Sequence, residues 1–77
     1  MANSYFQNAR MERLQHIKNT LDKSKEELNF IVYDKFVFDI QMKWGLTQQN
    51  AEDHLNTVMR GVNAHVEDGE IVWSKQK

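Results

Sequence analysis

The clearest hydrophobic pattern in this chain lies in its third quarter. Apolar residues recur there at steps of four, three and four, a spacing that places them on one face of a helix; they are Ala51, Leu55, Val58 and Val62. The hydroxyl of Thr47, just before this stretch, can accept a hydrogen bond from a backbone N–H of the first turn. We therefore predict a helix over residues 47–61 with one apolar and one polar face.

A matching apolar stripe comes before it, at Tyr33, Phe36, Val37, Ile40 and Trp44. Gly45 follows at once, and glycine readily adopts the left-handed conformation that ends a helix. The small side chain of Ala51 allows the preceding helix to cross closely. Two short helices joined by a tight corner are the pattern of a helix-turn-helix.

The stretch between residues 24 and 44 is open to three interpretations. The capping-box spacing of Ser24 and Glu27 favours one long helix from residue 25. Many side chains after residue 28 are β-branched or aromatic, which favours a strand. A strand throughout would follow the alternation of large apolar residues, but that alternation is interrupted where the helical stripe has no defect. We predict a short strand near residues 29–31 and then a helix over about 32–44.

The two ends of the chain predict a helix and a hairpin. A first helix is expected from about Tyr5 to an end near Asp22 to Ser24, with its buried face formed by Phe6, Ala9, Leu14, Ile17 and Leu21. Near the C-terminus, Asp68-Gly69 separates two alternating runs, and this dipeptide favours the type I′ turn of a β-hairpin. That turn pairs Glu67 with Glu70, Val66 with Ile71, His65 with Val72 and Ala64 with Trp73. We expect residues 1–4 and 75–77 to be flexible.

Length and composition predict one small soluble domain. The chain has 77 residues, of which 40% are hydrophobic and 27% are charged, and such values are ordinary for a globular protein. A domain of this size buries only about 60% of its unfolded surface, so its margin of stability is narrow. The absence of cysteine excludes a disulfide framework. No apolar run approaches the roughly 20 residues that span a bilayer, so we expect a cytoplasmic protein with no membrane contact.

The residue pattern does not indicate an enzyme. The three glycines are not clustered into a loop that could surround a phosphate, and no nucleophile elbow is present. Adjacent carboxylates such as Glu26 and Glu27 point apart on a helix and cannot act on one bond. His54 and His65 have no evident third ligand, so we expect no metal, and we interpret His54 as a half-buried packing residue. No cofactor or small-molecule ligand is evident.

The order of helix, short strand, helix, helix and two-stranded hairpin is that of a winged helix. The run Ile40-x-x-Lys43-x-Gly45-Leu46-Thr47, followed by Ala51 and Leu55, and the hairpin Glu67-Asp68-Gly69-Glu70-Ile71 ending in Trp73, resemble the small winged helix-turn-helix proteins common in archaea, their plasmids and their viruses. The resemblance spans about residues 14–73 and implies a mainly α fold with a small β-hairpin (α+β). His54 departs from the family pattern, because an aromatic residue often stands there. The usual basic residues of the exposed helix start or of the wing are neutral or acidic here.

The resemblance implies sequence-specific binding of double-stranded DNA by a small transcription regulator, nucleoid-associated in the cell. The helix over residues 47–61 would enter the major groove, where glutamine and asparagine can form paired hydrogen bonds with adenine. The expected base contacts are Gln48, Gln49, Asn50 and Asp53. The expected contacts with the DNA backbone are Lys35, Lys43, Thr47, Thr57 and Arg60. The plainer interpretation of the same amides is a neutral, solvated helix start.

The charge favours a second hypothesis, a winged helix that binds another protein and not DNA. The net charge is −1, whereas DNA-binding domains usually have a positive excess. Three carboxylates, Glu67, Asp68 and Glu70, surround the predicted turn. A positive stripe joining Lys35, Lys43 and Arg60 would favour DNA, and its absence would favour a protein partner.

A homodimer is expected if the chain binds DNA, because one near-neutral helix offers few phosphate contacts. Phe38 and Met42 lie opposite the main stripe of their helix, and together with Tyr5 they could form an apolar dimer surface. The commoner fate of large apolar residues is the core of the domain, and we expect that role for them here.

Overall fold

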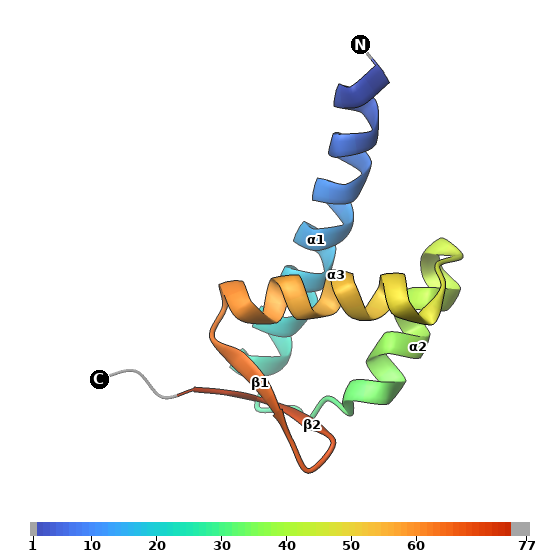
Figure 1. The fold of residues 1–77 in the computed structure, drawn as a ribbon. Helices are drawn as coiled ribbons and strands as arrows, with labels where there is room; N and C mark the ends of the chain where they lie inside the picture. Colours follow the sequence, from blue (N-terminus) through green and yellow to red (C-terminus); the bar gives the residue numbers. More distant parts are fainter. Residues whose placement is uncertain (1, 75–77) are drawn as a thin grey trace.

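The computed structural model describes residues 2–74 of the chain, with side chains from residue 9 onward. Three helices are followed by an antiparallel hairpin (Figure 1): α1 (Ala2–Glu26), α2 (Tyr33–Trp44), α3 (Gln48–Gly61), β1 (Ala64–Glu67) and β2 (Glu70–Trp73). Helix α3 crosses α1, whose N-terminal part projects beyond α3, and the hairpin lies at the other end of α1. This α+β order is compatible with a winged helix.

Helix α1 is longer than the sequence pattern predicts, because it begins at Ala2 and ends at Glu26. Ile17 and Leu21 form its fully buried contacts with the rest of the domain, as expected. The side chains of Tyr5 and Phe6, for which a surface role and burial were predicted, lie outside the described part of the chain. Residues 75–77, which were predicted to be flexible, lie outside it as well.

The predicted strand at residues 29–31 is wrong. The backbone N–H of Asn29 is bonded back to the Ser24 carbonyl of α1 at 2.9 Å, and α2 already begins at Tyr33. The pairing of this segment with the hairpin is confined to one isolated bridge between Val32 and Glu70. In this bridge the Ile71 N–H donates to the Ile31 carbonyl and the Tyr33 N–H donates to the Gly69 carbonyl, each at 2.9 Å. The segment between the two helices is too short to pair over the length of a strand. The non-helical residues between Glu26 and Tyr33 also rule out one long helix from residue 25, and α2 rules out a strand throughout.

The helix-turn-helix itself is confirmed. Gly45 ends α2 in the left-handed conformation with a φ of 66°, and its N–H donates to the Gln41 carbonyl. The Thr47 hydroxyl caps α3 by accepting a hydrogen bond from the Asn50 N–H at 3.2 Å. Ala51 is fully buried where the helices meet, which agrees with its predicted role at the crossing.

The hairpin has the predicted register, from Ala64 opposite Trp73 to Glu67 opposite Glu70. Asp68 and Gly69 have φ values of 53° and 80°, as a type I′ turn requires at both central positions. Ile71 is buried against the helices, whereas its partner Val66 is exposed. Only part of the inner face of the hairpin therefore covers the core.

The core gathers apolar side chains from all three helices and from β2. Its buried members are Ile17, Leu21, Val37, Ile40, Ala51, Leu55, Val58, Met59 and Ile71. Phe38 and Met42 are not among them, and 58% and 68% of their surfaces are exposed. The prediction that they belong to the core is wrong, because they lie on the side of α2 opposite Val37 and Ile40. No helix within residues 2–74 is long and apolar enough to cross a membrane.

Candidate nucleic-acid interface

Helix α3 presents one polar stripe to solvent along its whole length. Its members follow each other at steps of four, three and four, and all are exposed: Gln49, Asp53, Asn56 and Arg60. The buried residues Ala51, Leu55 and Val58 lie on the opposite side of the helix. Two of the predicted base contacts, Gln49 and Asp53, belong to this stripe. The stripe also contains Asn56, which was not among the predicted contacts.

The other two predicted base contacts lie at the start of α3, beside the cap. Gln48 is exposed, and its amide nitrogen donates to the Glu52 carboxylate at 3.1 Å. Asn50 is exposed too, and its backbone N–H is held by the Thr47 hydroxyl. The oxygen of that hydroxyl is therefore already an acceptor in the cap. A contact with a DNA phosphate would use the hydroxyl hydrogen as donor while the cap is kept.

The carboxylate of Asp53 is joined to a cation from another helix. The Arg10 guanidinium of α1 approaches it to 3.5 Å, with the two side chains 45% and 62% exposed respectively. The pair forms where α1 crosses α3, and it brings a positive charge next to the stripe. No sequence pattern indicates this pair, because Arg10 and Asp53 are more than 40 residues apart in the chain.

Asn56 is held by a residue of α2. The Tyr33 hydroxyl donates to the Asn56 side-chain oxygen at 2.9 Å. Burial raises the pKa of Tyr33 above its usual value, and the negative charge of Glu52 raises this pKa further. The phenol therefore remains protonated at neutral pH and continues to donate this hydrogen bond. It orients the Asn56 amide and leaves the amide nitrogen free to donate to a ligand.

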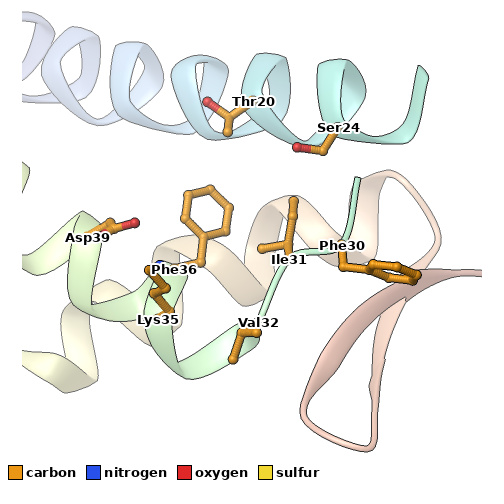
Figure 2. A pocket seen from close by; sticks show the side chains of 8 residues that line it. All are labelled: Thr20, Ser24, Phe30, Ile31, Val32, Lys35, Phe36 and Asp39. Carbon is orange, nitrogen blue, oxygen red and sulfur yellow. The ribbon is translucent and has the colours of Figure 1, made fainter. Parts of the chain in front are cut away.

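The three cations predicted to contact the DNA backbone do not form one positive stripe. Lys35 lines a hollow of about 260 Å³ between α1 and α2, where Figure 2 shows Phe36 pointing toward α1. Lys43 lines a second hollow between these helices, with Arg13 and His16. Arg60 lies apart from both on the outward stripe of α3.

Thr57, the remaining predicted backbone contact, is half-buried rather than freely exposed. Its hydroxyl donates to the Asp53 carbonyl of the preceding turn at 2.8 Å. The side chain also lines a hollow with Leu14 and Lys18 of α1, so it lies on the edge of α3 that faces α1 and is less accessible than the residues of the outward stripe.

The histidines do not form a metal site within the described residues. His54 is buried more deeply than predicted, with 6% of its surface exposed, and its Nδ1 lies 2.7 Å from the Asn50 carbonyl. His65 lies on the hairpin, where its Nε2 is 2.9 Å from a Glu67 carboxylate oxygen. No group of three metal-ligating side chains is present in the described part of the chain.

The arrangement as a whole is suited to binding and offers hydrogen-bonding groups on an exposed helix. Within that surface the described charges are balanced rather than strongly positive, since Arg10 and Arg60 are accompanied by Glu52 and Asp53. Comparison of the chain with models of protein families, with curated proteins and with solved structures found no match.

Proposed function

We propose that this chain binds double-stranded DNA in a sequence-specific manner, as a small, non-enzymatic transcription regulator that places α3 in the major groove. One observation supports this proposal most strongly. The polar side of α3, with its first-turn amides, is exposed to solvent and is not covered by any other described element. A helix free on one side is what the major groove accommodates, because the groove is about 12 Å wide.

The chemistry of this surface fits adenine best. Gln49 and Asn56 can each accept from adenine N6 and donate to N7, and each well-formed pair contributes roughly 1–3 kcal/mol of discrimination. The bond from Tyr33 holds Asn56 in one orientation, which lowers the entropy lost when a base is contacted. Gln48 and Asn50 stand at the helix start, where base contacts are usual in this docking geometry.

Arg10 changes the role that we propose for Asp53. A free carboxylate on this surface would repel phosphate, but the 3.5 Å contact with the Arg10 guanidinium offsets its charge. We assign the Arg10 side chain to a DNA phosphate and Asp53 to its positioning. Because such contacts remain few in one chain, we propose that a homodimer binds two half-sites.

The proposal is tested by selecting a duplex from a random DNA pool and titrating it by fluorescence anisotropy, first at low salt and then near physiological salt. We expect binding that weakens with salt. Gln49→Ala should change the preferred sequence, whereas Arg60→Ala should weaken binding equally on all sequences. No binding at low salt would refute the proposal, and an equal loss on every sequence for Gln49→Ala would refute the assigned base contact.

The charge arrangement supports one alternative function, a winged helix that binds a basic protein. Lys35, Lys43 and Arg60 do not form a common stripe, and the exposed turn of the hairpin is acidic at Glu67 and Asp68. This alternative predicts that the duplex titration is flat. It also predicts that neutralising the hairpin by Glu67→Gln and Asp68→Asn abolishes capture of the partner, whereas Gln49→Ala does not.

A further inference from the structure

The outward side of α2 presents a face that the folded chain leaves uncovered. Val32, Phe38 and Met42 are 48%, 58% and 68% exposed, and the charged residues Lys35 and Asp39 beside them are exposed as well. At 3.6 residues per turn these five positions fall within about 120° of one another. Figure 2 shows Val32 pointing away from α1, whereas Lys35 and Asp39 lie at the open edge of the hollow between α1 and α2. We call these five residues the α2 face.

The order of residues in the α2 face is symmetric in chemical type about Val37. Val32 and Met42 are the apolar residues five positions before and after it, and Lys35 and Asp39 are opposite charges two positions before and after it. With a rise of 1.5 Å per residue, these pairs lie about 7.5 Å and about 3 Å from that level. Phe38 lies next to the centre. A twofold axis at the level of Val37 would therefore place the apolar residues of one copy opposite the apolar residues of the other, and Lys35 of each copy opposite Asp39 of the other.

We propose that the α2 face is the surface through which two copies of this chain pair, with the two α2 helices antiparallel. In such a symmetric contact each pair of facing residues occurs twice, once on each side of the axis. Lys35 of each copy meets Asp39 of the other, Val32 meets Met42, and the two Phe38 rings meet at the axis. Among the side chains described, from residue 9 to residue 74, neither Lys35 nor Asp39 forms a salt bridge, so both charges are available to the second copy.

Two more exposed apolar residues precede the α2 face in the chain. Leu28 and Phe30 are 85% and 83% exposed, and they line a hollow beside β2 with Val72 and Trp73. Two helices of 12 residues are each about 18 Å long, and alone they cover less than the roughly 1,200 Å² of a stable interface. In the antiparallel pairing the segment before each α2 lies at one end of the contact, and we propose that Leu28 and Phe30 add the remaining area there. The pairing names the dimer surface of the proposed regulator, but its test does not involve DNA.

Sedimentation equilibrium of the full chain over a range of concentrations tests the pairing directly. The wild-type chain should dimerise, and Phe38→Ser should weaken the dimer about tenfold or more, because it removes the central apolar contact. Circular dichroism melting verifies that this variant is folded, which we expect because Phe38 contributes little to the core. Met11→Ser, on an exposed position of α1, is the matched control for the loss of an apolar surface residue, and Lys23→Glu, also exposed on α1, is the control for the charge reversals that test the register. A wild-type chain that stays monomeric, or a folded Phe38→Ser variant that dimerises normally, would overturn the proposal.

The register is tested by two charge reversals that compensate only between chains. Lys35→Glu and Asp39→Lys each place like charges across the axis, and each alone should weaken the dimer about tenfold. An equimolar mixture restores both opposite-charge pairs in a heterodimer, although each chain keeps like charges within its own helix. We expect the mixture to recover dimerisation to within about threefold of wild type. A mixture no better than either variant alone would overturn the register, whatever the DNA titration gives.

Discussion

The replacement Arg10→Ala tests the proposed surface at a residue whose role no local pattern predicts. The Arg10 side chain is half-exposed and lies 3.5 Å from the Asp53 carboxylate. Exposed ion pairs contribute about 0.2–1 kcal/mol to folding, so we expect the free energy of unfolding to fall by less than about 1 kcal/mol. An effect on DNA binding would therefore reflect the loss of the contact and not the loss of the fold.

The expected effect on DNA binding follows from counterion release. Each phosphate contact contributes about 0.9 to the slope of log affinity against log salt concentration. Arg10→Ala should therefore reduce the steepness of this slope by about 0.9 for each chain bound. Between about 50 and about 200 mM salt, this difference lowers the ratio of wild-type to variant affinity by about 3.5-fold.

The assay is a fluorescence anisotropy titration of the selected duplex at several salt concentrations. Asp53→Asn is the informative partner variant, because it keeps the cation and removes the opposing carboxylate, so affinity at low salt should rise. Lys23→Ala removes one positive charge from an exposed position of the same helix and should leave the slope nearly unchanged. The reasoning is refuted if Arg10→Ala has the wild-type slope, or if Lys23→Ala flattens the slope to the same degree.

Three further predictions concern folding and are measured by urea denaturation. Leu55→Ala removes a fully buried side chain and should cost about 2–5 kcal/mol, which leaves little of the stability of so small a domain; a loss under 1 kcal/mol would contradict the assigned core. Gly45→Ala meets no atom within 4 Å but requires a φ of 66°, so the strain should cost about 1 kcal/mol, and an unchanged midpoint would contradict the left-handed cap. His54→Leu removes a buried Nε2 that has no partner within the described residues and should change stability by less than about 1 kcal/mol; a loss above 2 kcal/mol would indicate a partner for this nitrogen.

The features that the sequence predicted well are those determined by neighbouring residues. Gly45 and Thr47 define the ends of their helices through bonds to residues only three or four positions away. Asp68 and Gly69 determine the hairpin register in the same local way. In each case the backbone conformation is specified by one or two side chains, so a short stretch of sequence is sufficient to predict it.

The features that it missed depend on contacts between distant segments. The predicted strand after α1 does not form, because Asn29 is bonded back to α1 and the few residues left before α2 make only one bridge with the hairpin, although these residues have strand propensity. Arg10 with Asp53 and Tyr33 with Asn56 meet only after the helices cross. The exposure of Phe38 on the outward side of α2 likewise contradicts the expectation that large apolar residues are buried.

The most direct test of the central proposal is an NMR titration of the isotope-labelled chain with its selected duplex, followed through the backbone amides. We predict that the largest changes in chemical shift fall at the start and along the outward stripe of α3, from Gln48 to Arg60, with further changes near Arg10. Changes confined to the hairpin or to the α2 face, with the amides of Gln48 to Asp53 unmoved, would contradict it.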